Sequence, residues 1–262
     1  EFSGNVFVCE PPGNLVHRRI LTPSGATFQS RRAREGVEFL ASPDDWFRPV
    51  NLTFGPDGAL YVVDMYRAVV EHPHWLAENI ARRLPFNAGD DRGRIYRILA
   101  DPSIIIREPP RLSKATSSEL VHQMAHPNAW WRETAARLIY QRQDPSAQGA
   151  LEAMVASGQT ALARIHALWA LHGLGAMKPF HVLRALKTAP RHGLIVVEDF
   201  LENKEVASAV LELADSKSAE VRFQLALTAS RMPESKNKTL ALARLLGKAG
   251  GDAFKTISKL IR

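Results

Sequence analysis

The sequence predicts two dissimilar parts, a β-sheet part followed by an array of paired α-helices. As far as about residue 100, short runs of strand-forming residues are broken by Gly and Pro, whereas from residue 118 apolar residues recur at helical spacing. Proline shifts too, with 11 before residue 111 and 5 after it. We expect β-sheet over residues 1–100, a linker or closing strand over 101–117, and helices over 118–262.

Charge divides the chain at a similar place. Residues 1–110 carry 13 Arg, no Lys and 14 acidic residues, whereas residues 111–262 have a net charge of +8. The positive residues are interspersed with acids along the helices, so we expect no nucleic-acid surface. No apolar run is long enough to span a bilayer. A single cysteine, Cys9, excludes an internal disulfide and a C-x-x-C-H haem site within this chain.

The β part contains a repeat. Residues 4–10 and 58–64 align at an offset of 54, and each copy runs from a glycine turn through strand-forming residues to an acid. Self-similarity at this period is typical of propeller blades. We expect further strands at 15–21, 26–30, 47–54 and 94–99, and a final one around residues 104–106. This part would then form about two four-stranded blades.

A long insertion at 65–93, with a short helix expected at 76–83, interrupts the second blade, and such loops are usually functional. In an antiparallel blade, the start of the innermost strand and the end of the second strand lie at one rim. We therefore expect six polar residues at this rim: Arg48, Asp64, Tyr66, Arg67, Glu10 and His72. They could bind a multiply charged polar ligand, with the arginines pairing to its carboxylates. Alternatively, they could pair with each other and hold the loops.

The helical part repeats as well. A helix expected at 118–125 is followed by a break at 126–128 and a helix at 130–139, and similar steps recur at 163–171, 190–201 and 221–227. Each step opens near an arginine, namely Arg132, Arg164, Arg191 and Arg222, at spacings of 32, 27 and 31. This pattern predicts about four HEAT-like repeats stacked as a solenoid. The arginines are expected to be structural, pairing with acids or carbonyls of the neighbouring repeat.

No other residue pattern predicts a metal site or a catalytic group. The histidine pair at 72 and 74 lacks the further ligands that a metal needs. The acidic turn at 89–93 lacks the spacing of an EF-hand loop.

Two segments carry a family resemblance. They are FVCEPPGNLVHR at residues 7–18 and, within residues 46–73, the motifs WFRPVNL, GPDGALYVVDMYR and EHP. They resemble the propeller end of the large membrane-bound dehydrogenase-like proteins of Planctomycetes and Verrucomicrobia. Those propellers are similar to soluble glucose/sorbosone dehydrogenases that use pyrroloquinoline quinone. HEAT repeats commonly follow in that family, and a c-type cytochrome domain often follows them. The resemblance covers residues 1–100 with specific motifs, and the rest only as a repeat pattern.

The resemblance implies a secreted or periplasmic quinoprotein-type dehydrogenase acting on a sugar or alcohol. It implies pyrroloquinoline quinone with Ca²⁺ in the full-length protein and a c-type cytochrome domain downstream. The cofactor would contact Arg48, Arg67, Asp64, Tyr66 and Glu10. The early blades, where relatives keep a catalytic base histidine, are not in this chain, so the chain alone is expected to be inactive. The alternative is a non-catalytic propeller-plus-solenoid scaffold that binds a protein or a glycan.

Overall fold

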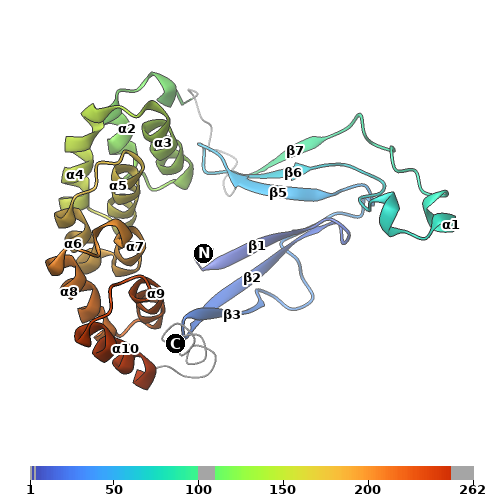
Figure 1. Cartoon of the computed structure of the whole chain (residues 1–262). Coiled ribbons are helices and arrows are strands. Elements are labelled where there is room, and N and C mark those ends of the chain that lie inside the picture. The colour runs from blue at the N-terminus through green and yellow to red at the C-terminus, as the bar shows by residue number, and fades with distance from the viewer. Residues whose placement is uncertain (1, 3, 100–109, 249–262) are drawn as a thin grey trace. The chain divides into compact units, whose positions relative to one another are not determined.

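The structure is a computed structural model that describes residues 2, 4–99 and 110–248. The chain divides into two compact units, one built from residues 1–24 and 28–109 and one from residues 25–27 and 110–262. Antiparallel β-sheets form the first unit and helices form the second (Figure 1). The predicted order of β-sheet and then helices is therefore confirmed. The strand expected around residues 104–106 lies outside the described residues.

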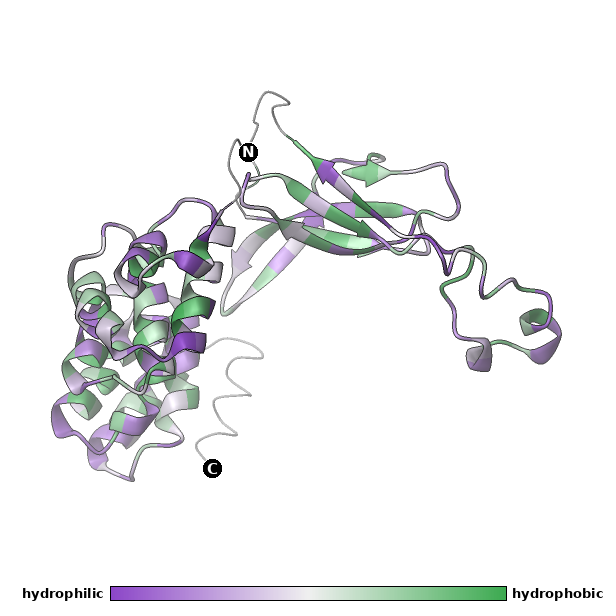
Figure 2. Ribbon diagram, turned by 90° about the horizontal axis from the view of Figure 1, so that it is seen from above, coloured by the Kyte–Doolittle hydropathy of each residue, from purple (hydrophilic) through white to green (hydrophobic). Residues whose placement is uncertain are grey.

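The first sheet has four strands: β1 (Asn5–Glu10), β2 (Leu15–Ser24), β3 (Thr27–Arg32) and the short β4 (Leu40–Ala41). They are ordered β1-β2-β3, and β4 also pairs with β2. Phe7 lies opposite Arg18, and Cys9 lies opposite Val16. Figure 2 shows hydrophobic residues mixed with hydrophilic ones along the strands. Burial alternates along β1, where Phe7 and Cys9 are partly buried and Val6 and Val8 are exposed, as expected for a sheet with one face against a core.

The second sheet has three antiparallel strands in the order β5 (Pro49–Phe54), β6 (Leu60–Asp64) and β7 (Arg94–Ile98). Its hairpin between β5 and β6 falls on the Asp-Gly turn that the sequence predicts. A small core joins the two sheets: Val16, Phe47 and Val62 are buried, with Phe7, Phe39, Leu40, Leu52 and Ile98 packed against them. Because this core draws on both sheets, the sheets stack face to face.

The insertion between β6 and β7 contains a single 3-10 turn (Pro73–Trp75) and the short helix α1 (Glu78–Ala81). The helix is shorter than the predicted 76–83. Its N-cap residue is Ala77, which offers no side-chain hydrogen bond to the first turn. Trp75 on this loop is 80% exposed.

Nine α-helices form the described part of the second unit: α2 (Ser117–Gln123), α3 (Ala129–Arg142), α4 (Gln148–Ser157), α5 (Ala161–Gly173), α6 (Pro179–Thr188), α7 (Pro190–Val196), α8 (Lys204–Glu212), α9 (Ala219–Ala229) and α10 (Lys236–Lys248). Polar side chains fix several of their starts. Thr116, Asn128, Thr160, Asn203 and Ser218 each accept a hydrogen bond from a first-turn amide.

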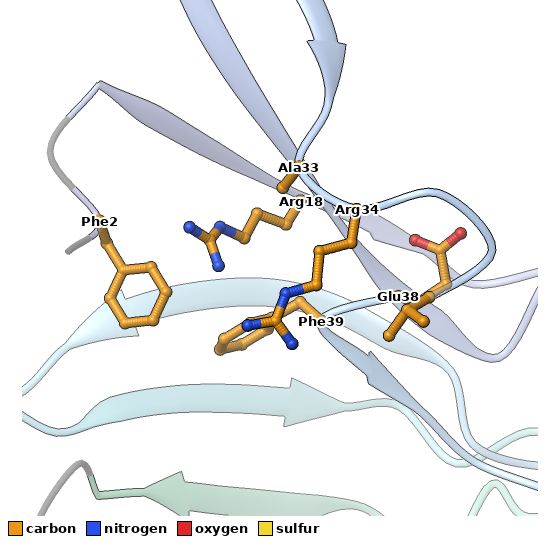
Figure 3. Close-up of a pocket in the computed structure, with 7 residues that line it drawn as sticks. Phe2, Arg18, Ala33, Arg34, Glu38 and Phe39 are labelled. Atoms are coloured by element: carbon orange, nitrogen blue, oxygen red, sulfur yellow. The ribbon is translucent and has the colours of Figure 1, made fainter.

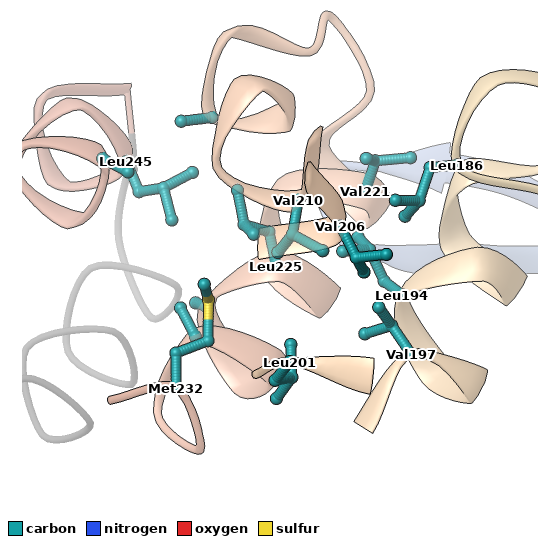
Figure 4. Packing of buried hydrophobic residues seen from close by; sticks show 14 of the residues in the cluster. Leu186, Leu194, Val197, Leu201, Val206, Val210, Val221, Leu225, Met232 and Leu245 are labelled. Atoms are coloured by element: carbon teal, nitrogen blue, oxygen red, sulfur yellow. The ribbon is translucent and has the colours of Figure 1, made fainter. Parts of the chain in front are cut away.

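The helices form two layers. Consecutive helices pair as α2 with α3, α4 with α5, α6 with α7 and α8 with α9. Even-numbered helices also contact the next even-numbered helix, and α3, α5, α7 and α9 do the same among themselves. The interior between the layers is aliphatic. Figure 4 shows its later part, where Leu186 of α6, Val206 and Val210 of α8, and Leu225 of α9 belong to one cluster.

Candidate functional site

The predicted rim forms where β5 begins and β6 ends. Pro49 lies opposite Asp64 in the register of these strands, and the Met65 amide donates to the Arg48 carbonyl at 2.9 Å. Arg48 is therefore beside Asp64 and the residues that follow it. The predicted neighbourhood of Arg48, Asp64, Tyr66 and Arg67 is confirmed.

Asp64 stabilises the turn after β6. Its side chain is buried, and Oδ1 accepts from the backbone amides of Arg48 and Tyr66, both at 2.8 Å. Oδ2 is buried and has no hydrogen-bond partner among the described residues. A carboxylate with two amide donors holds its loop strongly, because charge-assisted hydrogen bonds are roughly twice as strong as neutral ones.

Arg48 binds backbone carbonyls. Nε donates to the carbonyl of Arg67 at 3.0 Å, and the two terminal nitrogens donate to the carbonyls of Pro11 at 3.0 Å and Ala68 at 2.9 Å. Pro11 follows β1, whereas Arg67 and Ala68 follow β6. One guanidinium therefore joins the ends of two strands that belong to different sheets.

Tyr66 occupies a constrained position. Its φ of 51° is left-handed, and its ring lies 5.6 Å from the Trp46 ring and under the Arg94 guanidinium at 3.5 Å. Gly89, at a φ of 90°, passes so close that a Cβ there would lie 2.4 Å from the Tyr66 carbonyl oxygen. The later part of the insertion, around Gly89, therefore packs against the rim at Tyr66. Sequence analysis missed Trp46 and Arg94 as rim residues, although Trp46 begins the motif that contains Arg48.

The remaining predicted rim residues differ in their hydrogen bonds and in their exposure. The Arg67 amide donates to the Trp46 carbonyl at 3.1 Å, and one terminal nitrogen of its side chain is buried with no partner among the described residues. Glu10 is exposed at the end of β1. His72 is also exposed, and its ring accepts from the His74 amide at 3.1 Å to cap the 3-10 turn of the insertion. The structure thus gathers Arg48, Asp64, Tyr66 and Arg67. Among the described residues, neither Glu10 nor His72 makes a hydrogen bond or ion pair with them.

In the helical unit, three of the four marker arginines make the same contact. Each lies at the fourth position of its helix, and a terminal nitrogen donates to the carbonyl six residues earlier. The pairs are Arg132 to His126 at 2.7 Å, Arg164 to Gly158 at 2.5 Å and Arg222 to Ser216 at 2.7 Å. The role is structural, but the carbonyls belong to the arginine's own helical pair and not to the neighbouring repeat. Arg191, at the second position of α7, is exposed and makes no such contact.

The layer of odd-numbered helices carries a Trp–His contact. Trp169 Nε1 on α5 donates to His192 Nδ1 on α7 at 3.1 Å. Burial lowers the pKa of His192 below its ordinary value, and the nearby charge of Arg191 adds to this. Burial, with the charge of Arg132, likewise lowers the pKa of His166. Both histidines are therefore expected to be neutral at pH 7.

Comparison with known proteins gives a family match for the β part of the chain. Residues 1–101 match a family described as a domain of unknown function (DUF7133). No curated protein and no solved structure matches the chain. In the part of the chain that the structure describes, no helix is long and apolar enough to cross a membrane. Within the same residues, no three His, Cys, Asp or Glu side chains gather in a way that could hold a metal ion.

Proposed function

We propose that this chain is a non-catalytic support and interaction segment. In this proposal the β unit forms two adjacent propeller blades, and the helical unit is a HEAT-like solenoid that binds a protein partner. The observation that carries the proposal is the use of Arg48 and Asp64. These charged groups form hydrogen bonds with backbone atoms of the rim itself, so they retain few hydrogen-bonding positions for a charged ligand.

Exposed apolar residues on both outer faces of the β unit support the assignment to propeller blades. Val6 and Val8 point away from the shared core and are 37% and 44% exposed. On the other sheet, Ile95 lies on the face opposite Val62 and is 68% exposed. A blade packs against a neighbour on each side, so apolar residues on both faces of a sheet pair are typical of blades. The offset of 54 residues also aligns β1 with β6, and each is followed by an antiparallel partner.

The stacked helical pairs and the recurring arginine contacts support the solenoid. The odd-numbered layer also exposes large side chains suited to a protein partner: Tyr140 on α3, Leu162 and Trp169 on α5, and Leu227 on α9. Tyr and Trp are enriched among residues that dominate protein interfaces. The charge of +8 over residues 111–262 favours a partner with an acidic surface.

The proposal can be tested on the full-length protein with pyrroloquinoline quinone and Ca²⁺. We expect no change in melting temperature and no reduction of an electron-accepting dye with a panel of sugars and alcohols. A rise of several degrees that Arg67→Gln abolishes, together with dye reduction, would overturn the non-catalytic proposal. Arg67 is the sensitive position because its guanidinium retains an unpartnered nitrogen. Arg83→Gln, an exposed residue of the insertion, is the matched control.

The second candidate is a quinoprotein-type sugar or alcohol dehydrogenase in the periplasm or outside the cell, supported by the motifs at residues 7–18 and 46–73. The described residues do not fit pyrroloquinoline quinone by themselves. Arg48 is engaged with three carbonyls, and the free nitrogen of Arg67 is buried. A functional cofactor site, with its Ca²⁺ and a downstream c-type cytochrome domain, would depend on groups outside the described residues.

A further inference from the structure

A pocket of about 210 Å³ lies beside β2 and shares no residue with the rim (Figure 3). Its walls combine two cations with two aromatic rings: Phe2, Arg18, Ala33, Arg34, Val37, Glu38 and Phe39. In Figure 3 the Arg18 guanidinium points toward Phe2 and that of Arg34 points toward Phe39. The rings of Phe2 and Phe39 are 6.1 Å apart and nearly perpendicular.

The one acidic residue of this pocket does not neutralise its arginines. Glu38 Oε1 pairs with Arg32 at 2.6 Å, and Oε2 pairs with His17 Nδ1 at 2.5 Å. These hydrogen bonds hold the pKa of Glu38 below its ordinary value. Glu38 is thus a carboxylate with both oxygens already paired to groups outside the pocket lining.

The two arginines retain most of their hydrogen-bond donors. Arg18 Nε donates to Asn5 Oδ1 at 2.7 Å, and its guanidinium lies 4.5 Å from the Phe2 ring centre. Its terminal nitrogens have no hydrogen-bond partner among the described residues. Arg34 is exposed, and its side chain has no ion pair or hydrogen bond within those residues either. Two neighbouring guanidinium groups therefore present unpaired N–H donors to one small cavity.

We propose that this pocket binds a small aromatic carboxylate. The carboxylate would lie between Arg18 and Arg34, since guanidinium groups match the geometry of carboxylates and bind them in a bidentate manner. The ring would pack on Phe39 and Val37. The cavity is smaller than the roughly 300–1,000 Å³ of pockets for drug-sized ligands, which limits the ligand to one or two rings. This proposal is independent of the proposed function, because no rim or helix residue takes part.

Titration calorimetry of the whole chain with benzoate, benzamide and inorganic phosphate tests the proposal. We expect benzoate to bind, and benzamide and phosphate to bind at least about tenfold more weakly, since benzamide lacks the charge and phosphate lacks the ring. Arg34→Gln should weaken benzoate binding by about tenfold or more. Arg31→Gln should leave it unchanged, because exposed Arg31 is nearby on β3 but lies outside the pocket lining.

Any of three results would overturn the proposal: no benzoate binding, equal binding of benzoate and benzamide, or equal effects of Arg34→Gln and Arg31→Gln. Equal binding of phosphate and benzoate would show a general anion site and so remove the aromatic part of the proposal. Both substituted residues are exposed, and circular dichroism of each variant would show that the fold is kept.

Discussion

At the rim of the β unit, the guanidinium of Arg48 donates hydrogen bonds to the carbonyls of Pro11, Arg67 and Ala68. The antiparallel register alone predicts that Arg48 lies beside Asp64. The partners of Arg48 could not be predicted, because the direction of a loop carbonyl depends on the path of the whole loop. An arginine at this position could bind either a ligand or backbone carbonyls, and the conformation of the folded loops determines which of the two it binds.

Replacing Arg48 should destabilise the β unit. Arg48→Ala leaves three carbonyls without their charged donor, and we expect a loss of about 2–4 kcal/mol in the free energy of unfolding. Arg48→Lys should recover only part of this, because an ammonium group cannot reproduce the planar fork of a guanidinium. Urea denaturation would measure both. A loss for Arg48→Ala no greater than for exposed Arg83→Ala would contradict the proposed role of Arg48.

At the scale of elements, close contacts between helices matter as much as helical periodicity. Gly193 on α7 faces α6 so closely that a Cβ there would lie 2.7 Å from the Leu186 amide nitrogen. Gly149 on α4 has no atom within 4 Å of its Cβ position. Both glycines look alike in the sequence, since each lies within a helix. Only the packing of helices distinguishes a glycine that permits close approach from one that merely lowers helix propensity.

Alanine at these two glycines should therefore have opposite effects. Gly193→Ala is expected to lower the free energy of unfolding by about 1–3 kcal/mol, because the added methyl group meets the backbone of α6. Gly149→Ala should raise it by up to about 1 kcal/mol through better helix propensity. Thermal unfolding followed by circular dichroism would compare them. If both variants were stabilised, this would contradict the prediction that Gly193 is needed for the close contact between α6 and α7.

At the scale of the whole molecule, a buried histidine links stability to pH. His181 on α6 is only 1% exposed, and its Nδ1 accepts from the Lys178 amide at 3.0 Å. Burial lowers its pKa below the ordinary value of 6.5; Lys178 also lowers it, whereas Glu152 opposes the shift. The unfolded chain therefore binds protons more readily than the folded chain. Above pH 6.5, His181 is neutral in both the folded and the unfolded chain, and its contribution to the free energy of unfolding is at its maximum. This contribution is lost as the pH falls from 6.5 toward the lower pKa of His181 in the folded chain.

We accordingly expect the urea concentration at the midpoint of unfolding to decrease as the pH is lowered from about 7.5 to about 5.5, a range above the pKa of most carboxylates. His181→Asn, which keeps an acceptor for the Lys178 amide but does not titrate, should flatten part of this fall. His122→Asn at an exposed position of α2 is the control. An unchanged pH profile in His181→Asn would show that His181 does not contribute.

The sequence by itself determined the order of β-sheet and helices and the positions of most strands. These features depend on local periodicity and turn residues, which act within a few residues. Sequence alone also placed Arg48 beside Asp64, because antiparallel pairing fixes which strand ends meet.

Tertiary structure alone decided what the polar groups bind. In the folded chain, Arg48 donates to three carbonyls, and Trp46 and Arg94 lie against Tyr66. Arg18 and Arg34 line one pocket, whereas Glu38 pairs with groups outside its lining. The physical reason is that these contacts join segments far apart in the chain. Their partners depend on loop paths and sheet stacking, which no local pattern specifies.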